Sequence, residues 1–312
     1  MRHDLVTLFA GVFALLLAAS LAGSVLSRRR ASGEPSELVD TLNARIKAWW
    51  WMTLALAIAS ALGTGGVIVL FAFISFLCLR EYVSIAYTRR TDHWALALAF
   101  FFFLPLQYVL VGWRWFEVYV VLIPVYGFLT LPAFAALSSD TTRYFERAAK
   151  VLAALVTCVY CVSYVPALMT LRIAGFEDGG LLLIAWLVLV VQVSDLLQHV
   201  WGRLFGRHPV APALSPTRTL EGVTGGVMSA GVLGAVLSWL TPFSVAQAAG
   251  VAVVCAIMGS FGSVAWLAVK RDRGIRDWGT ILERHGGMLD RLDSVIFAAP
   301  VYFHVLYLGW HK

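Results

Sequence analysis

Residues 181–193 read LLLIAWLVLVVQV, an uncharged apolar run that continues to Gln198 with Asp195 as its one charged residue. A helix needs about 20 predominantly apolar residues to cross a bilayer. Similar runs recur along the chain, near 5–27, 49–63, 65–80, 93–111, 116–137, 150–170, 180–198, 222–240, 244–268 and 294–310. They are too long for strands and lack an alternation of period two. The sequence therefore predicts an all-α, polytopic transmembrane helical bundle with about 9–10 membrane helices.

The composition agrees with a membrane protein and argues against an ordinary soluble domain. Of the 312 residues, 60% are hydrophobic and 13% are charged, whereas soluble domains carry about 25% charged residues. No polar stretch is long enough to fold separately, so residues 1–312 are predicted to form a single membrane domain. Residues 1–140 supply N-terminal helices, and residues 141–312 contain the motifs. Segments 49–63 and 65–80 are short, and whether both cross the bilayer stays open at this point.

The placement of lysine and arginine predicts the orientation. If every segment crosses, one side of the membrane receives all of these residues except Arg2, Arg114, Arg172 and Lys312. Loops rich in Lys and Arg face the cytoplasm in most membrane proteins. We therefore expect an integral protein of a bacterial inner (plasma) membrane, with both termini outside. The two long polar loops, residues 195–226 and 270–293, are then both cytoplasmic.

The second of these loops combines carboxylates with a glycine pair. Asp290 and Asp293 are three residues apart, so a helix that begins after Gly287 places both on one face. Asp277 is a third carboxylate upstream. Such hard oxygen ligands suit Mg²⁺, which also binds substrate phosphate oxygens. Gly286 and Gly287 allow backbone amides to approach a phosphate at the start of a helix.

Basic residues interleave with these carboxylates, which is the pattern expected around a metal-bound polyphosphate. They are Lys270, Arg271, Arg276 and Arg291. The alternative is a solvated interfacial loop whose charges pair with one another and with lipid headgroups. Taken alone, His285 is more often a structural hydrogen-bonding residue than a catalytic one. Glu81, far upstream, is expected to pair with Arg80 or Arg89.

The order of residues in this loop closely resembles the C-terminal signature of the phosphatidate cytidylyltransferases, also called CDP-diacylglycerol synthases. That pattern is Lys-Arg, four residues, Lys-Asp, a small residue two positions on, then His-Gly-Gly, two residues, Asp-Arg, one residue and Asp. Every spacing is matched, by Lys270-Arg271, Arg276-Asp277, Gly279, His285-Gly286-Gly287, Asp290-Arg291 and Asp293. Three positions depart from the pattern: Leu267 replaces a serine, Arg276 a lysine, and Glu283 a proline or glycine.

The first loop carries a second resemblance to the same family. Residues 215–222 read SPTRTLEG and look like its Ser-Pro-x-Lys-Thr-x-Glu-Gly element, with Arg218 in place of the lysine. Asp195 stands where the family has an aspartate, but the family's Asp-Thr-Gly-Ala-Tyr is here Asp-Leu-Leu-Gln-His, residues 195–199. Ser215 and Thr219 are candidates to bond phosphate or ribose. Glu221 has the alternative of capping the next helix.

The resemblance implies a reaction, a cofactor and partners. The reaction is CTP-dependent cytidylyl transfer to phosphatidic acid, which gives CDP-diacylglycerol and pyrophosphate by in-line attack at the α-phosphate of CTP. The implied cofactor is Mg²⁺, with a second cation left open. The partners are CTP, phosphatidic acid and the lipid bilayer; a homodimer is left open, and no nucleic acid is expected.

The resemblance also assigns roles to individual residues. The catalytic set is Lys270, Arg271, Arg276, Asp277, His285, Asp290 and Asp293. The substrate-binding set is Ser215, Arg218, Thr219, Glu221, Gly286, Gly287 and Arg291. The metal ligands are Asp277, Asp290 and Asp293, with Asp195 as a weaker fourth.

Two alternatives stay open at this point. A related CTP-dependent enzyme that acts on another membrane lipid phosphate, or on a lipid alcohol, would use the same metal and nucleotide residues. A transporter would place charges at mid-membrane depth and show a repeat between its halves. Here the charges cluster near the ends of the apolar segments, which favours the enzyme.

Overall fold

The computed structural model describes residues 2–29, 37–86, 89–137, 139–177, 179–212, 214–279 and 286–311. Each of the ten predicted apolar segments forms helix there. Seven helical spans are long and apolar enough to cross a membrane: Gly63–Ile85, Arg90–Trp113, Phe116–Ala136, Tyr144–Thr170, Gly180–Phe205, Val245–Arg273 and Leu289–Trp310. Three shorter apolar helices are Ala10–Val25, Trp49–Ala61 and Leu220–Val236. The predicted polytopic helical bundle is confirmed.

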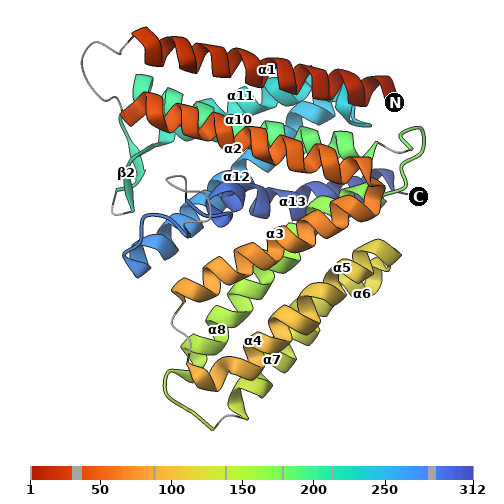
Figure 1. Ribbon diagram of the computed structural model, residues 1–312, viewed down its shortest axis with the longest axis vertical. Helices are drawn as coiled ribbons and strands as arrows, with labels where there is room; N and C mark the ends of the chain where they lie inside the picture. Colours follow the sequence, from red (N-terminus) through yellow and green to blue (C-terminus); the bar gives the residue numbers. More distant parts are fainter. Residues whose placement is uncertain are drawn as a thin grey trace.

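The first three helices are α1 (Arg2–Arg29), α2 (Glu37–Ala61) and α3 (Gly63–Ile85). The chain turns back between α2 and α3 at Gly63, whose φ of 77° lies in the left-handed region that glycine adopts at low cost. In Figure 1, α2 and α3 run in opposite directions across the bundle. Segments 49–63 and 65–80 are therefore parts of two separate helices that form a hairpin.

The next three spans interrupt α-helix with wider turns. The first contains η1 (Arg90–Asp92), α4 (His93–Leu98), η2 (Ala99–Phe103) and α5 (Leu104–Trp113). The second contains α6 (Phe116–Val121), η3 (Leu122–Gly127) and α7 (Phe128–Ala136), and the third α8 (Tyr144–Leu155), η4 (Val156–Cys161), α9 (Val162–Ala167) and η5 (Leu168–Thr170). The π-helical turn η3 contains Pro124, and η2 precedes Pro105. Proline lacks an N–H donor, and a wide turn accommodates it within a span.

The last third of the chain forms α10 (Gly180–Phe205), β1 (Pro209–Ala211), β2 (Ser215–Thr219), α11 (Leu220–Val236), η6 (Ser238–Leu240), α12 (Val245–Arg273) and α13 (Leu289–Trp310). The two strands form an antiparallel hairpin in which Pro209 pairs with Thr219 and Ala211 with Ser215. The sequence did not predict this hairpin. It gives the first motif loop a defined shape between α10 and α11.

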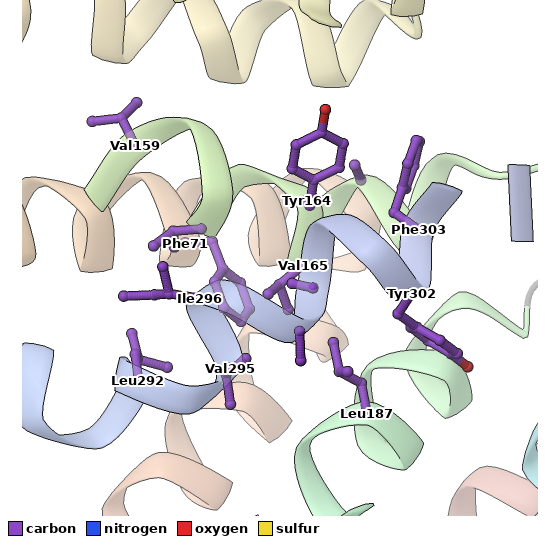
Figure 2. Close-up of a cluster of buried hydrophobic side chains, with 14 of the residues drawn as sticks. Phe71, Val159, Tyr164, Val165, Leu187, Leu292, Val295, Ile296, Tyr302 and Phe303 are labelled. Carbon is purple, nitrogen blue, oxygen red and sulfur yellow. The ribbon is translucent and has the colours of Figure 1, made fainter. Parts of the chain in front are cut away.

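Helix α13 lies in the middle of the C-terminal half and supplies much of its core. Figure 2 shows its side chains between those of α3, α9 and α10. The Tyr302 ring stacks on that of Trp186 with centroids 5.0 Å apart, and Phe303 meets Tyr164 edge-on at 5.1 Å. Because α13 is packed on several sides, its first turn is held in a defined place at one end of the bundle.

The two motif loops share one end of the bundle. In Figure 1 the β-hairpin and the connection from α12 to α13 lie at the same side, and both termini lie at the opposite side. At that opposite side the backbone N–H of Arg172 donates to His311 Nδ1 at 3.1 Å, which ties the last helix to the α9–α10 connection. This arrangement agrees with the predicted topology, in which successive segments cross the membrane in alternate directions and both motif loops lie on the same side.

A buried ionic network holds two further connections at the motif end. The Arg147 guanidinium, on α8, is 1% exposed; its Nε donates to Asp92 Oδ1 and its Nη1 to Asp140 Oδ2, each at 3.0 Å. Its Nη2 also donates to the Asp140 carbonyl at 2.9 Å. Arg89 Nη1 reaches Asp140 Oδ2 at 3.1 Å. The network therefore joins the α3–α4 and α7–α8 connections to α8.

Replacing Arg147 with alanine is expected to lower the free energy of unfolding by about 3–5 kcal/mol, because Asp92 would stay buried without its charge partner. The matched control is Arg90→Ala, which removes an exposed arginine from the same connection and should change stability by less than about 0.5 kcal/mol. Thermal unfolding of the purified protein in detergent measures both changes. Equal melting temperatures for the two variants would contradict the prediction.

Candidate functional site

The site is built around the first turn of α13, which a carboxylate from α3 holds in place. Glu81 is 4% exposed. The backbone N–H of Met288 donates to its Oε1 at 2.8 Å, and that of Leu289 to its Oε2 at 2.9 Å. The first N–H groups of a helix have no partner within the helix and attract negative charge. Glu81 thus caps α13, and the positive charge of Arg80 also acts on it, so the structure gives this carboxylate a role beyond the expected ion pair with Arg80 or Arg89.

The glycine pair leaves room for this carboxylate and for a second one. A Cβ at Gly287 would lie 2.4 Å from Glu81 Oε2, and a Cβ at Gly286 would lie 2.6 Å from Asp290 Oδ2. The φ of Gly286 is 80°, a conformation that a larger residue adopts only with strain. Both positions therefore need glycine so that the loop can close around two carboxylates. Whether their amides also approach a phosphate stays a prediction.

Asp290 binds the protein's own groups. The Lys270 ammonium donates to Asp290 Oδ1 in a salt bridge, and the backbone N–H groups of Trp278 and Gly287 donate to Oδ2 at 2.9 Å and 2.7 Å. A predicted phosphate-binding lysine and a predicted metal ligand therefore bind each other. Asp290 joins the end of α12, the motif loop and the start of α13 in one contact.

Asp293 lies one turn further along α13 and faces α10. Its Oδ1 accepts from the Ser294 backbone N–H at 2.8 Å, and its charge is repelled by Asp195 of α10. Arg218, on β2, is close enough for both carboxylates to act on its charge. Burial lowers the pKa of the Arg218 guanidinium, and the attraction of Asp195 and Asp293 opposes that shift. Two acidic groups from distant parts of the sequence are thus near enough to one arginine for their charges to act on it.

The remaining predicted residues of the first loop support its backbone. Thr219 caps α11, since its Oγ1 accepts from the Gly222 N–H at 3.2 Å. Glu221 Oε2 accepts from the backbone N–H groups of Arg207 and His208, at 3.1 Å and 3.2 Å. The Ser215 hydroxyl lies 3.3 Å from that of Thr217 on the same strand. Their roles toward a substrate stay predictions.

The predicted residues of the second loop differ in exposure. Arg276 and Asp277 are exposed, and Arg271 Nε donates to the Leu214 carbonyl at 3.3 Å, which links the two motif loops. Arg291 is partly buried on the first turn of α13. His285 lies outside the described residues. Within the described part of the chain, no three His, Cys, Asp or Glu side chains gather closely enough to form a complete metal site.

The model of the cytidylyltransferase family matches residues 43–308, which is most of the chain. The chain belongs to the cytidylyltransferase family.

Two kinds of relative accompany this assignment. The chain is 33% identical over 300 residues to the uncharacterized protein YnbB of Escherichia coli, an alignment that covers 95% of this chain and 96% of YnbB. It is 34% identical over 146 residues to the phosphatidate cytidylyltransferase of Staphylococcus haemolyticus, and 32% identical over 127 residues to that of Staphylococcus aureus. These matches cover 46% and 40% of this chain, and 56% and 49% of the relatives.

The residues around Asp195 and Asp293 would fit a divalent cation. Asp195 and Asp293 repel each other in a partly buried place, and a cation between them would relieve that repulsion. Magnesium ions are commonly held by one or two carboxylates and by substrate phosphate oxygens. Two carboxylates would therefore be sufficient for the ion, with its other positions filled by water or, once a nucleotide binds, by phosphate oxygens. This pairing favours Asp195 as a ligand more strongly than the sequence did.

Replacing Gly287 with alanine is expected to destabilise the protein by about 1–3 kcal/mol, because the added methyl group overlaps the Glu81 carboxylate. Gly250→Ala on α12 is the control, since a Cβ there meets nothing within 4 Å. That change should leave stability unaltered or raise it by up to about 1 kcal/mol. Thermal unfolding in detergent measures the stability of both variants, and hydrogen exchange of the Met288 and Leu289 amides reports on the capping of α13. Unchanged amide protection in Gly287→Ala would contradict the capping role of Glu81.

Proposed function

We propose that this protein transfers the cytidylyl group of CTP to phosphatidic acid, with CDP-diacylglycerol and pyrophosphate as products. The observation that carries the proposal is that the charges of Asp195 and Asp293 act on each other and on Arg218, close to the Lys270–Asp290 pair. Membership of the cytidylyltransferase family supports CTP-dependent transfer to a lipid. The name of the staphylococcal relatives supports phosphatidic acid as the acceptor.

The reaction is a displacement at phosphorus. An oxygen of the lipid phosphate forms a bond to the α-phosphorus of CTP, and the bond from that phosphorus to the oxygen bridging to the β-phosphate breaks. The electron pair of the broken bond leaves with pyrophosphate. The protein contributes alignment of the two phosphates and stabilisation of the charge on their oxygens.

The basic residues of both loops are assigned to phosphate oxygens. Arg218 contributes a planar fork of donors beside the two carboxylates. Arg271 and Arg276 are exposed at the same end of the bundle, where they can meet an incoming nucleotide. Lys270 is held by Asp290, so its charge stays beside the first turn of α13. Thr219, Glu221 and the glycine pair act in this scheme by fixing the two loops.

Mg²⁺ is the proposed cofactor, held by Asp293 and Asp195, and when bound it neutralises charge on the nucleotide phosphates. Asp290 contributes to the same negative field while it orders the loop. Asp277 is exposed nearby and is assigned to a second cation or to the incoming metal-nucleotide complex. The motif loops are assigned to the cytoplasmic side of a bacterial inner membrane, because CTP is made in the cytoplasm.

A different lipid acceptor is the second candidate, for the following reason. The E. coli relative that matches nearly the whole chain has no acceptor in its name, and the present chain differs from the phosphatidate cytidylyltransferase motif at Gln198 and Arg218. The alternative acceptor is another membrane lipid phosphate or a lipid alcohol. The same carboxylates and arginines would serve it.

The test is conversion of phosphatidic acid and labelled CTP to CDP-diacylglycerol by the purified protein in detergent. Activity should need Mg²⁺ and stop with EDTA. Asp293→Asn should lower kcat by about 100-fold or more, because it removes a proposed carboxylate ligand of the cation that neutralises charge on the nucleotide phosphates. The control is Asp272→Asn, since that carboxylate at the end of α12 is 71% exposed, and its activity should stay within about twofold of wild type.

Each other outcome changes the assignment in a defined way. If the protein turned over a polyprenyl phosphate or a lipid alcohol but not phosphatidic acid, the acceptor would be reassigned and CTP would remain the proposed nucleotide. A folded protein that binds no CTP would overturn the proposed function. Full activity of Asp293→Asn would overturn the metal assignment.

A further inference from the structure

Two departures from the family motif lie in direct contact. Gln198 occupies the place of the motif's alanine, and Arg218 the place of its lysine. Arg218 Nη2 donates to Gln198 Oε1 at 2.8 Å, and Arg218 Nη1 donates to Ser263 Oγ at 2.7 Å. Both terminal nitrogens of the arginine are therefore held, one by α10 and one by α12. The residues are 20 positions apart in sequence, and only the packing of β2 against these helices brings them together.

Gln198 is itself fixed on every polar atom. Its Nε2 donates to Ser260 Oγ at 2.9 Å, with longer contacts to Ser194 Oγ at 3.3 Å and Asp195 Oδ1 at 3.4 Å. The side chain is 6% exposed. A buried amide with both ends bonded has one favourable orientation, because turning it over would place like partners together. Gln198 therefore offers its oxygen to Arg218 and no other arrangement competes.

The fold also leaves space for this glutamine. A Cβ at Gly226 of α11 would lie 2.3 Å from Gln198 Cγ, so any larger residue at 226 would displace the side chain. An alanine at position 198 would fill little of that space. The room between α10 and α11 is thus used by the Gln198 side chain.

The result is an arginine anchored by neutral oxygens although two carboxylates are near. Asp195 and Asp293 both attract the Arg218 charge, while its hydrogen bonds go to Gln198 and Ser263. A guanidinium has five N–H donors, so these two bonds leave three for another acceptor such as a phosphate. A lysine has a single nitrogen with three donors, so an ammonium that bonded both partners would keep one donor for a further acceptor, where the guanidinium keeps three.

We propose that Gln198 is a positioning residue that directs the Arg218 guanidinium away from Asp195 and Asp293, so that the carboxylates bind the divalent cation and the arginine binds phosphate. Gln198 and Arg218 act as a coupled pair that replaces the small-residue and lysine pair of the motif. Replacing either residue alone is then expected to weaken binding of the cation. The phosphate part of this proposal rests on the proposed function, and the cation part does not.

The test compares wild type with Gln198→Ala, Arg218→Lys and the double variant, each as the full chain in detergent. Binding of Mn²⁺ is followed by electron paramagnetic resonance in the absence of lipid and CTP. Gln198→Ala should weaken Mn²⁺ binding about tenfold, because the released guanidinium competes for the carboxylates; loss of a residue that orients metal ligands typically costs 10–100-fold. Arg218→Lys should weaken it in the same direction, since a mobile ammonium is then close to both carboxylates.

The double variant decides between positioning and simple support of the fold. If Gln198 acts on the cation only through Arg218, the double variant should bind Mn²⁺ no more weakly than Arg218→Lys alone, since contacting residues of a coupled pair are not additive. Melting temperature does not distinguish the three variants, because each lacks the hydrogen bond between Arg218 and Gln198. The control Gln247→Ala removes a capping residue at the far end of α12, and it should lower the melting temperature and leave Mn²⁺ affinity unchanged.

The possible results separate this proposal from the proposed function. The positioning role would be overturned if Gln198→Ala bound Mn²⁺ with wild-type affinity. It would also be overturned if the loss of Mn²⁺ affinity in the double variant equalled the product of the losses in the two single variants. Absence of Mn²⁺ binding by the wild-type protein would overturn it as well. Coupled losses of Mn²⁺ binding in a protein that converts no lipid would keep the positioning role and reject the proposed function.

Discussion

The contact on which the site depends is the capping of α13 by Glu81. Two backbone N–H groups at the start of a buried helix would otherwise need partners in a region that the bundle shields from water. Glu81 supplies both acceptors from a helix more than 200 residues earlier in the chain. The contact fixes where α13 begins, and with it the positions of Asp290 and Asp293. Gly286 and Gly287 are required because the carboxylates lie directly against their backbone.

At the end of the bundle that carries the two motif loops, charged side chains form two different kinds of group. The Arg147 network is closed: its carboxylates and guanidinium satisfy one another and lock two connections to α8. The group around Asp195 and Asp293 contains two carboxylates that repel each other beside an arginine held by neutral partners. The first arrangement is typical of structural support, and the second is one that a bound cation would stabilise. This contrast locates the candidate site without reference to any relative.

Sequence reasoning identified the correct region and some roles within it. The spacing of Asp290 and Asp293 predicted a shared helix, and both lie on the first turns of α13. The spacing did not reveal that Asp290 accepts two backbone N–H groups and the Lys270 ammonium, since these donors come from three different segments. It gave Asp195 a minor place because the residues around it depart from the motif. It gave Glu81 only an ion pair with a nearby arginine, because no local pattern marks a carboxylate that caps a distant helix.

By itself, the sequence determined the helical class, the order of the membrane segments and the common side of the two motif loops. These follow from the length of apolar runs and from charge placement, which act locally along the chain. Only the tertiary structure decided which charged residues meet, because the packing of α3, α10, α12 and α13 brings together positions that are distant in sequence. Glu81 with α13 and Gln198 with Arg218 are contacts of this kind, and the charge of Asp195 acts on Asp293 for the same reason.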